Sequence, residues 1–66
     1  MEILKVLDVD CDNCAVHVSK ALEGVKGIEN LDIRLSEKTA IVTFDPDKVS
    51  KQEITEKVED FGYDVE

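Results

Sequence analysis

The chain has 66 residues, 42% hydrophobic and 36% charged, and a net charge of −8 at neutral pH. This length allows one domain, residues 1–66, with a small core, and the composition is that of a folded chain. Eight basic against sixteen acidic residues argue against nucleic-acid binding, which requires clustered Lys and Arg. The sequence has no long apolar run and no signal-peptide pattern, so we expect a cytoplasmic protein without membrane insertion.

The N-terminal part of the chain predicts a strand followed by a helix. Residues 2–8 are rich in Ile, Leu and Val, which is typical of a strand. From Asn13 onward, apolar residues recur on one helical face, at Cys14, Val18, Ala21, Leu22 and Val25. Asp10 or Asp12 can cap the N-terminus of this helix.

Two further strands are predicted after the helix. Gly24 and Gly27 bracket the end of the helix and can supply its left-handed stop. Apolar residues alternate with polar ones in residues 28–35 and again in residues 39–44, a pattern typical of strands with one buried face. Residues 36–38 form the turn between them.

The C-terminal part predicts a second helix and a short last strand. Pro46 ends the preceding strand, and Ser50 with Glu53 three residues later is a capping-box signature. The buried face of this helix is expected at Ile54, Val58 and Phe61. Gly62 stops the helix, and residues 63–65 can form a last strand. The order β-α-β-β-α-β predicts an α+β, ferredoxin-like fold, an antiparallel four-stranded sheet with two helices on one face.

A few apolar residues do not fit the buried face. If Leu4 and Val6 point to the core, then Ile3, Leu7 and Ile41 lie on the open face of the sheet. Single exposed apolar residues are common in folded proteins, whereas a cluster of them would indicate a surface for self-association.

The only two cysteines, Cys11 and Cys14, lie where the first strand gives way to the first helix. Thiolates select Cu(I), Zn(II) and similar thiophilic ions, and unpaired N–H groups at a helix N-terminus stabilise negative charge. Two ligands on a loop suit an ion that is passed on, because a structural zinc site uses four. His17, three residues later, is expected to be a surface residue rather than a ligand.

Three other kinds of site use residues of these types: a redox pair, an iron–sulfur cluster and a calcium loop. A redox Cys-x-x-Cys remains the alternative, although the chain is short for the thioredoxin fold. An iron–sulfur cluster requires four cysteines. The run of Asp8, Asp10 and Asp12 imitates the start of a calcium loop, but the loop's glycine would fall at Asn13 and its last glutamate at Ser19.

The whole chain resembles the heavy-metal-associated domain family of small copper chaperones, mercury carriers and N-terminal domains of metal-pumping P-type ATPases. The motifs that carry the resemblance are Cys11-x-x-Cys14, Val18-x-x-Ala21-Leu22, Gly27-Ile28, Ala40-x-Val42-x-Phe44-Asp45 and Phe61-Gly62-Tyr63-Asp64-Val65. The resemblance implies the ferredoxin-like fold and soft-metal binding by Cys11 and Cys14. It also implies that Tyr63 occupies an aromatic position near the metal loop of bacterial copper chaperones.

The loop departs from the usual family pattern, Gly-Met-x-Cys-x-x-Cys. Asp8 replaces the glycine, and Val9 replaces the methionine, which normally packs beneath the loop, so we expect Val9 to pack there with less reach. Asp10 resembles the aspartate of the Asp-Cys-x-x-Cys loops in zinc, cadmium and lead pump domains, and is a candidate third ligand for a divalent ion. Its alternative role is a helix cap.

The resemblance implies a protein that traffics metal rather than an enzyme. We expect Cu(I) as the cargo, delivered by thiolate exchange to a metal-transporting P-type ATPase or its N-terminal domain. The alternative is a Zn(II), Cd(II) or Hg(II) domain that uses Asp10. A monomer is expected, with a metal-bridged dimer as the alternative state.

Overall fold

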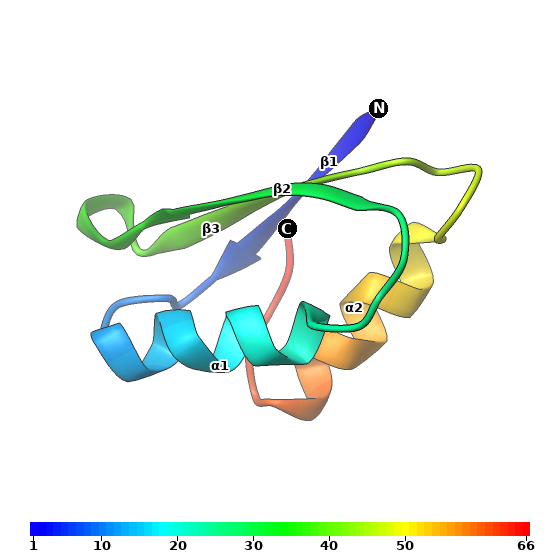
Figure 1. Ribbon diagram of the computed structural model, residues 1–66. Helices are drawn as coiled ribbons and strands as arrows, with labels where there is room; N and C mark the ends of the chain where they lie inside the picture. The colour runs from blue at the N-terminus through cyan, green and yellow to red at the C-terminus, as the bar shows by residue number, and fades with distance from the viewer.

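The computed structural model describes residues 1–66, and it contains five main elements around one sheet. They are β1 (Glu2–Leu7), α1 (Asp12–Leu22), β2 (Ile28–Arg34), β3 (Thr39–Phe44) and α2 (Lys51–Asp60), with a 3-10 turn η1 (Leu35–Glu37) between β2 and β3. The strands form an antiparallel sheet in the order β1-β3-β2, and both helices lie on one side of it (Figure 1). The predicted order of these elements is confirmed. Neither helix combines the length and apolar content that crossing a membrane requires.

The predicted fourth strand is not formed. Tyr63 turns into the core and its N–H donates back to the Val58 carbonyl at 3.4 Å, so little chain is left to run beside β1. Val65 makes a single antiparallel bridge to Val6. The flanking backbone bonds run from the Leu7 N–H to the Asp64 carbonyl, 2.8 Å, and from the Glu66 N–H to the Lys5 carbonyl, 2.9 Å. The C-terminal segment therefore covers the edge of β1 without becoming a strand.

Alternate residues of β1 and β3 point toward the helices and form the core, as predicted. In the register of β1 with β3, Leu4 lies opposite Val42 and Val6 opposite Ala40, and all four side chains are buried under the helices. The largest fully buried side chain is that of Phe44.

The open face carries the three apolar residues that the alternation assigned to it. Ile3 is 65% exposed, while Leu7 and Ile41 are half-buried. Across the strand pair, Ile3 lies opposite Thr43 and Ile41 opposite Lys5, so apolar and polar side chains are interleaved.

The second helix begins as predicted and ends one residue early. The Ser50 Oγ accepts from the Glu53 N–H at 3.1 Å, and Ile54 and Val58 are fully buried. The prediction that Phe61 lies on the buried face is wrong. Phe61 is the C-cap residue and is 46% exposed, because the helix ends at Asp60.

Candidate metal site

The loop between β1 and α1 is anchored to the core and to the turn before β3 by Val9. Asp8 adopts a left-handed conformation (φ 65°), which L-residues other than Asn and Asp rarely tolerate, and it reverses the chain at the end of β1. Val9 is fully buried, and its N–H donates to the Lys38 carbonyl at 3.0 Å. Val9 therefore packs beneath the loop, as the sequence indicated, and the turn after β2 supports it.

Cys11 is the N-cap of α1. Its backbone is extended, and its Sγ accepts a hydrogen bond from the Cys14 N–H at 3.0 Å. The prediction that Asp10 or Asp12 caps the helix is therefore wrong, and Asp12 is instead the first helical residue. A sulfur in this position lies in the field of the helix N-terminus, which stabilises negative charge. Sequence rules favour Ser, Thr, Asp or Asn as caps, so they did not identify a cysteine cap.

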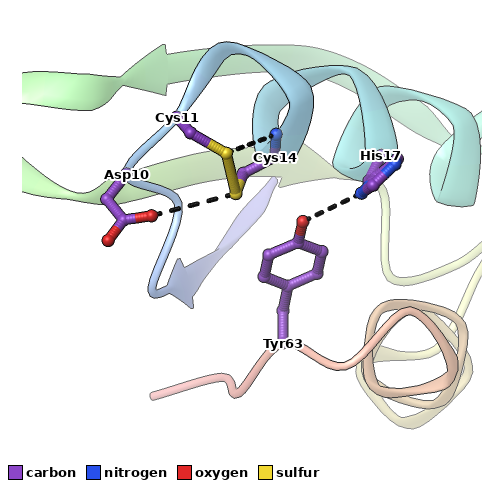
Figure 2. The surroundings of a disulfide bond; sticks show 5 residues. All are labelled: Asp10, Cys11, Cys14, His17 and Tyr63. Carbon is purple, nitrogen blue, oxygen red and sulfur yellow. Dashed lines mark hydrogen bonds between the residues drawn. A yellow bond between two sulfur atoms is a disulfide. The ribbon is translucent and has the colours of Figure 1, made fainter.

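The two sulfurs are joined by a disulfide in this structure (Figure 2). The Cα atoms of Cys11 and Cys14 lie 5.1 Å apart, which is within the usual range for a disulfide. A metal ion can bind here only after the disulfide is reduced, because the ligand is the thiolate.

Asp10 points toward the cysteine pair rather than toward the helix backbone. Its Oδ1 lies 3.8 Å from the Cys14 Sγ, and one ligand atom from each of Asp10, Cys11 and Cys14 lies within 4.8 Å of the others (Figure 2). In the reduced protein the Cys14 thiol can donate to this carboxylate. Asp10 and Cys11 are exposed and Cys14 is half-buried, so all three predicted site residues converge at an accessible place.

His17 belongs to a neighbouring contact and not to this cluster. Its Nδ1 lies 3.2 Å from the Tyr63 hydroxyl, which Figure 2 shows directed at the first turns of α1. The contact supplies the partner that the hydroxyl of a buried tyrosine needs. The His17 ring also lies near the ring of Phe61, with centroids 6.1 Å apart. Sequence reasoning missed both contacts, since no local pattern links residues 44 to 46 positions apart.

The chain matches a known protein family over almost its whole length. The profile of the family described as "Heavy-metal-associated domain" matches residues 3–64, nearly the whole chain. The chain belongs to this family. The resemblance that the sequence motifs indicated is therefore confirmed.

This heavy-metal-associated domain is similar to parts of larger transport proteins. It is 41% identical over 61 residues to the copper-transporting ATPase ccc2 of Schizosaccharomyces pombe, covering 92% of this chain but 7% of the ATPase. It is 38% identical over 60 residues to the periplasmic component of the mercuric transport protein of Pseudomonas fluorescens, covering 91% of this chain and 66% of that protein.

A solved structure agrees with the domain over nearly its full length. The CopZ metallochaperone is 34% identical, with a TM-score of 0.80, and the alignment covers 98% of this chain and 97% of that one. The fold of this domain is therefore the ferredoxin-like fold of its family, with three regular strands.

Proposed function

We propose that this domain binds one thiophilic metal ion through the thiolates of Cys11 and Cys14 and passes it to a partner. The observation that carries this proposal is the convergence of both sulfurs and the Asp10 carboxylate within 4.8 Å at the N-terminus of α1. Soft sulfur ligands favour Cu(I) and other thiophilic ions over magnesium or calcium. Cu(I) is the cargo we propose first, and relatives named for copper transport and copper binding support it.

Loading and release follow from thiol chemistry. A thiol reductant supplies the two electrons and two protons that convert the Cys11–Cys14 disulfide into two thiols, and metal binding then displaces the thiol protons. The two sulfurs must move apart on binding, since a two-coordinate ion separates its ligands by roughly twice a metal–sulfur bond, about 4.5 Å. A partner's thiolates can then replace these ligands one at a time. No bond of a substrate is made or broken apart from metal–ligand bonds, so we propose a carrier rather than an enzyme.

Asp10 offers a carboxylate ligand that suits a divalent ion better than Cu(I). In a tetrahedral zinc site, a sulfur and a carboxylate oxygen are separated by about 3.6 Å, given the usual bond lengths. In the disulfide form the Cys14 Sγ and the Asp10 Oδ1 are 3.8 Å apart, so the carboxylate already lies within reach of an ion bound to Cys14. Zn(II), Cd(II) and Hg(II) are therefore the alternative cargo, with Asp10 as a third ligand.

The proposed partner is a metal-transporting P-type ATPase or its N-terminal domain. The similarity to a segment of a copper-transporting ATPase supports this, since like domains can exchange an ion between like loops. We propose the cytoplasm as the compartment, because its reducing conditions keep such a cysteine pair in the thiol form. The periplasm is the alternative compartment, because the similar mercuric transport protein is named as a periplasmic component.

Competitive titration of the reduced protein with Cu(I), Zn(II) and Cd(II), followed by native mass spectrometry, tests this proposal. One Cu(I) per chain, retained against the other two ions, is the expected result. Preferential retention of Zn(II) or Cd(II) would replace Cu(I) with the Asp10-assisted site. Failure to retain any of the three ions would contradict metal carriage.

The disulfide favours a second candidate function, a small dithiol–disulfide redox protein. This candidate predicts repeated turnover with a dithiol reductant and a disulfide substrate in the presence of a chelator. Turnover that stops after one equivalent of reductant would leave metal carriage as the function.

A further inference from the structure

The two edges of the sheet differ in how they are covered. The C-terminal segment lies along β1, as the bonds of Leu7 and Glu66 show. At the other edge, residues 29–34 of β2 make no backbone hydrogen bond outside the ladder with β3. β2 therefore presents unpaired N–H and C=O groups, which form a template for another strand.

An apolar groove runs beside this free edge. It has a volume of about 540 Å³ and is lined by residues of α1 and β2. Its apolar lining consists of Ala15, Val16, Leu22, Ile28, Leu31 and Ile33. Leu31 and Ile33 are only half-buried, whereas their β3 neighbours Val42 and Ala40 are fully buried. The helix layer thus stops short of the β2 edge.

A free edge beside an apolar groove is the geometry that strand addition uses. The added strand pairs with the exposed backbone, and its alternate side chains enter the groove. We propose that the occupant is β2 of a second copy of this chain, running antiparallel about a two-fold axis at Leu31.

The residues of β2 suit this symmetric pairing. Residues directly opposite each other in an antiparallel pair lie on the same face. Leu31 then meets Leu31 of the second copy on the groove side. On the open side, Asn30 lies opposite Asp32 of the second copy, twice by symmetry, so an amide faces a carboxylate and no like charges are opposed. The register shift between Ile28 and Asn30 limits the regular pairing to the residues that follow it, so about an axis at Leu31 the paired segment is residues 30–32 of each copy.

The groove's charges also favour a second copy over a charged partner. The charged residues that line it are Lys20 and Glu23, whose opposite charges cancel. A basic partner would instead be attracted to the loop with Asp8, Asp10 and Asp12. The contact contains neither cysteine, so this dimer is distinct from one bridged by metal.

The proposed dimerisation should depend on salt concentration. Each copy carries a charge of −8, so the two copies repel each other. Raising salt from about 0.1 M to about 1 M shortens the screening length from about 10 Å to about 3 Å and weakens this repulsion. The dimer should therefore become more populated as salt rises.

Sedimentation equilibrium of the reduced protein in a chelator, up to about 1 mM chain, tests the proposal. Val16→Glu changes an exposed residue of the groove (49% exposed) and should lower the association constant by about tenfold or more, since it places a charge against apolar surface. Ile3→Glu is the matched control, because it adds the same charge at a residue 65% exposed on the open face of β1. It should associate like the wild type.

Nuclear magnetic resonance locates the contact. Concentration-dependent shifts confined to β2 and α1 support the proposal. A wild-type protein that remains monomeric at high salt, a Val16→Glu variant that associates normally, or shifts that map to Ile3 and Ile41 would each overturn it.

Discussion

At the residue scale, the sulfur of Cys11 has two roles, since it caps α1 and is a proposed metal ligand. Serine is among the best N-cap residues, so Cys11→Ser should keep the helix while removing a soft ligand. Cys14→Ser removes the other. Each change should lower Cu(I) affinity by more than about 100-fold, beyond the loss typical of residues outside the ligand shell. Metal titration with circular dichroism measures both effects. Near-native affinity in either variant would contradict the two-thiolate site.

A second prediction concerns Asp10. Asp10→Ala should lower Zn(II) and Cd(II) affinity by at least about tenfold and leave Cu(I) affinity within about threefold, because Cu(I) needs no carboxylate ligand. Asp12→Asn is the matched control, since it removes a neighbouring charge from the first helical turn without touching the cluster. Equal losses for all three ions in the Asp10 variant would show that Asp10 acts through charge alone.

Single residues also show how far the sequence could predict the site. The spacing of Cys11 and Cys14 and the position of Asp10 predicted a cluster that the structure brings together. Capping statistics assigned the cap to aspartate, because they reflect oxygen acceptors and miss a sulfur held by the same geometry. The contact between His17 and Tyr63 depends on tertiary packing and leaves no local signal.

At the element scale, the link between α1 and β2 depends on one glycine. A Cβ at Gly27 would lie 2.9 Å from the Cβ of Lys48 and the Cγ1 of Val49, and its φ is +98°. Gly27→Ala should lower the free energy of unfolding by about 2–4 kcal/mol, from steric overlap and left-handed strain together. Gly24→Ala is the control, since it has φ +84° but no atom within 4 Å, and it should cost about 1 kcal/mol. Urea unfolding measures both, and equal losses would mean that the overlap relaxes.

Periodicity predicted the strands and helices well and their ends less well. Alternation in β1 and β3 marks the buried face because one side of the sheet is covered by helices. The C-terminal segment does not form a strand because the Tyr63 side chain is buried in the core. A pattern of only three residues cannot reveal this burial. Phe61 was placed on the buried face because its spacing continues the helix, although the helix ends before it.

At the scale of the whole molecule, the net charge of −8 and the three loop aspartates predict docking on a basic surface of the metal acceptor. The association rate should fall as salt rises, because salt screens electrostatic steering. Asp8→Asn with Asp12→Asn should slow metal transfer at low salt and leave metal affinity nearly unchanged, and asparagine tolerates the left-handed backbone at position 8.

The control removes the same charge elsewhere. Glu23→Gln with Glu29→Gln neutralises the C-cap residue of α1 and a residue of β2, and Glu23 lies about 16 Å along the helix from the loop. Stopped-flow transfer at two ionic strengths compares the pairs. A rate indifferent to salt, or equal slowing by both pairs, would show that the loop carboxylates do not steer docking.

The central claim is that Cys11 and Cys14 together hold one metal ion. Native mass spectrometry of the reduced protein with one equivalent of Cu(I), followed by a thiol-alkylating reagent, tests it most directly. We predict one ion per chain, displacement of both thiol protons, and protection of both cysteines from alkylation. A chain that retains no ion, or that retains it while both cysteines are alkylated at the metal-free rate, would contradict the account.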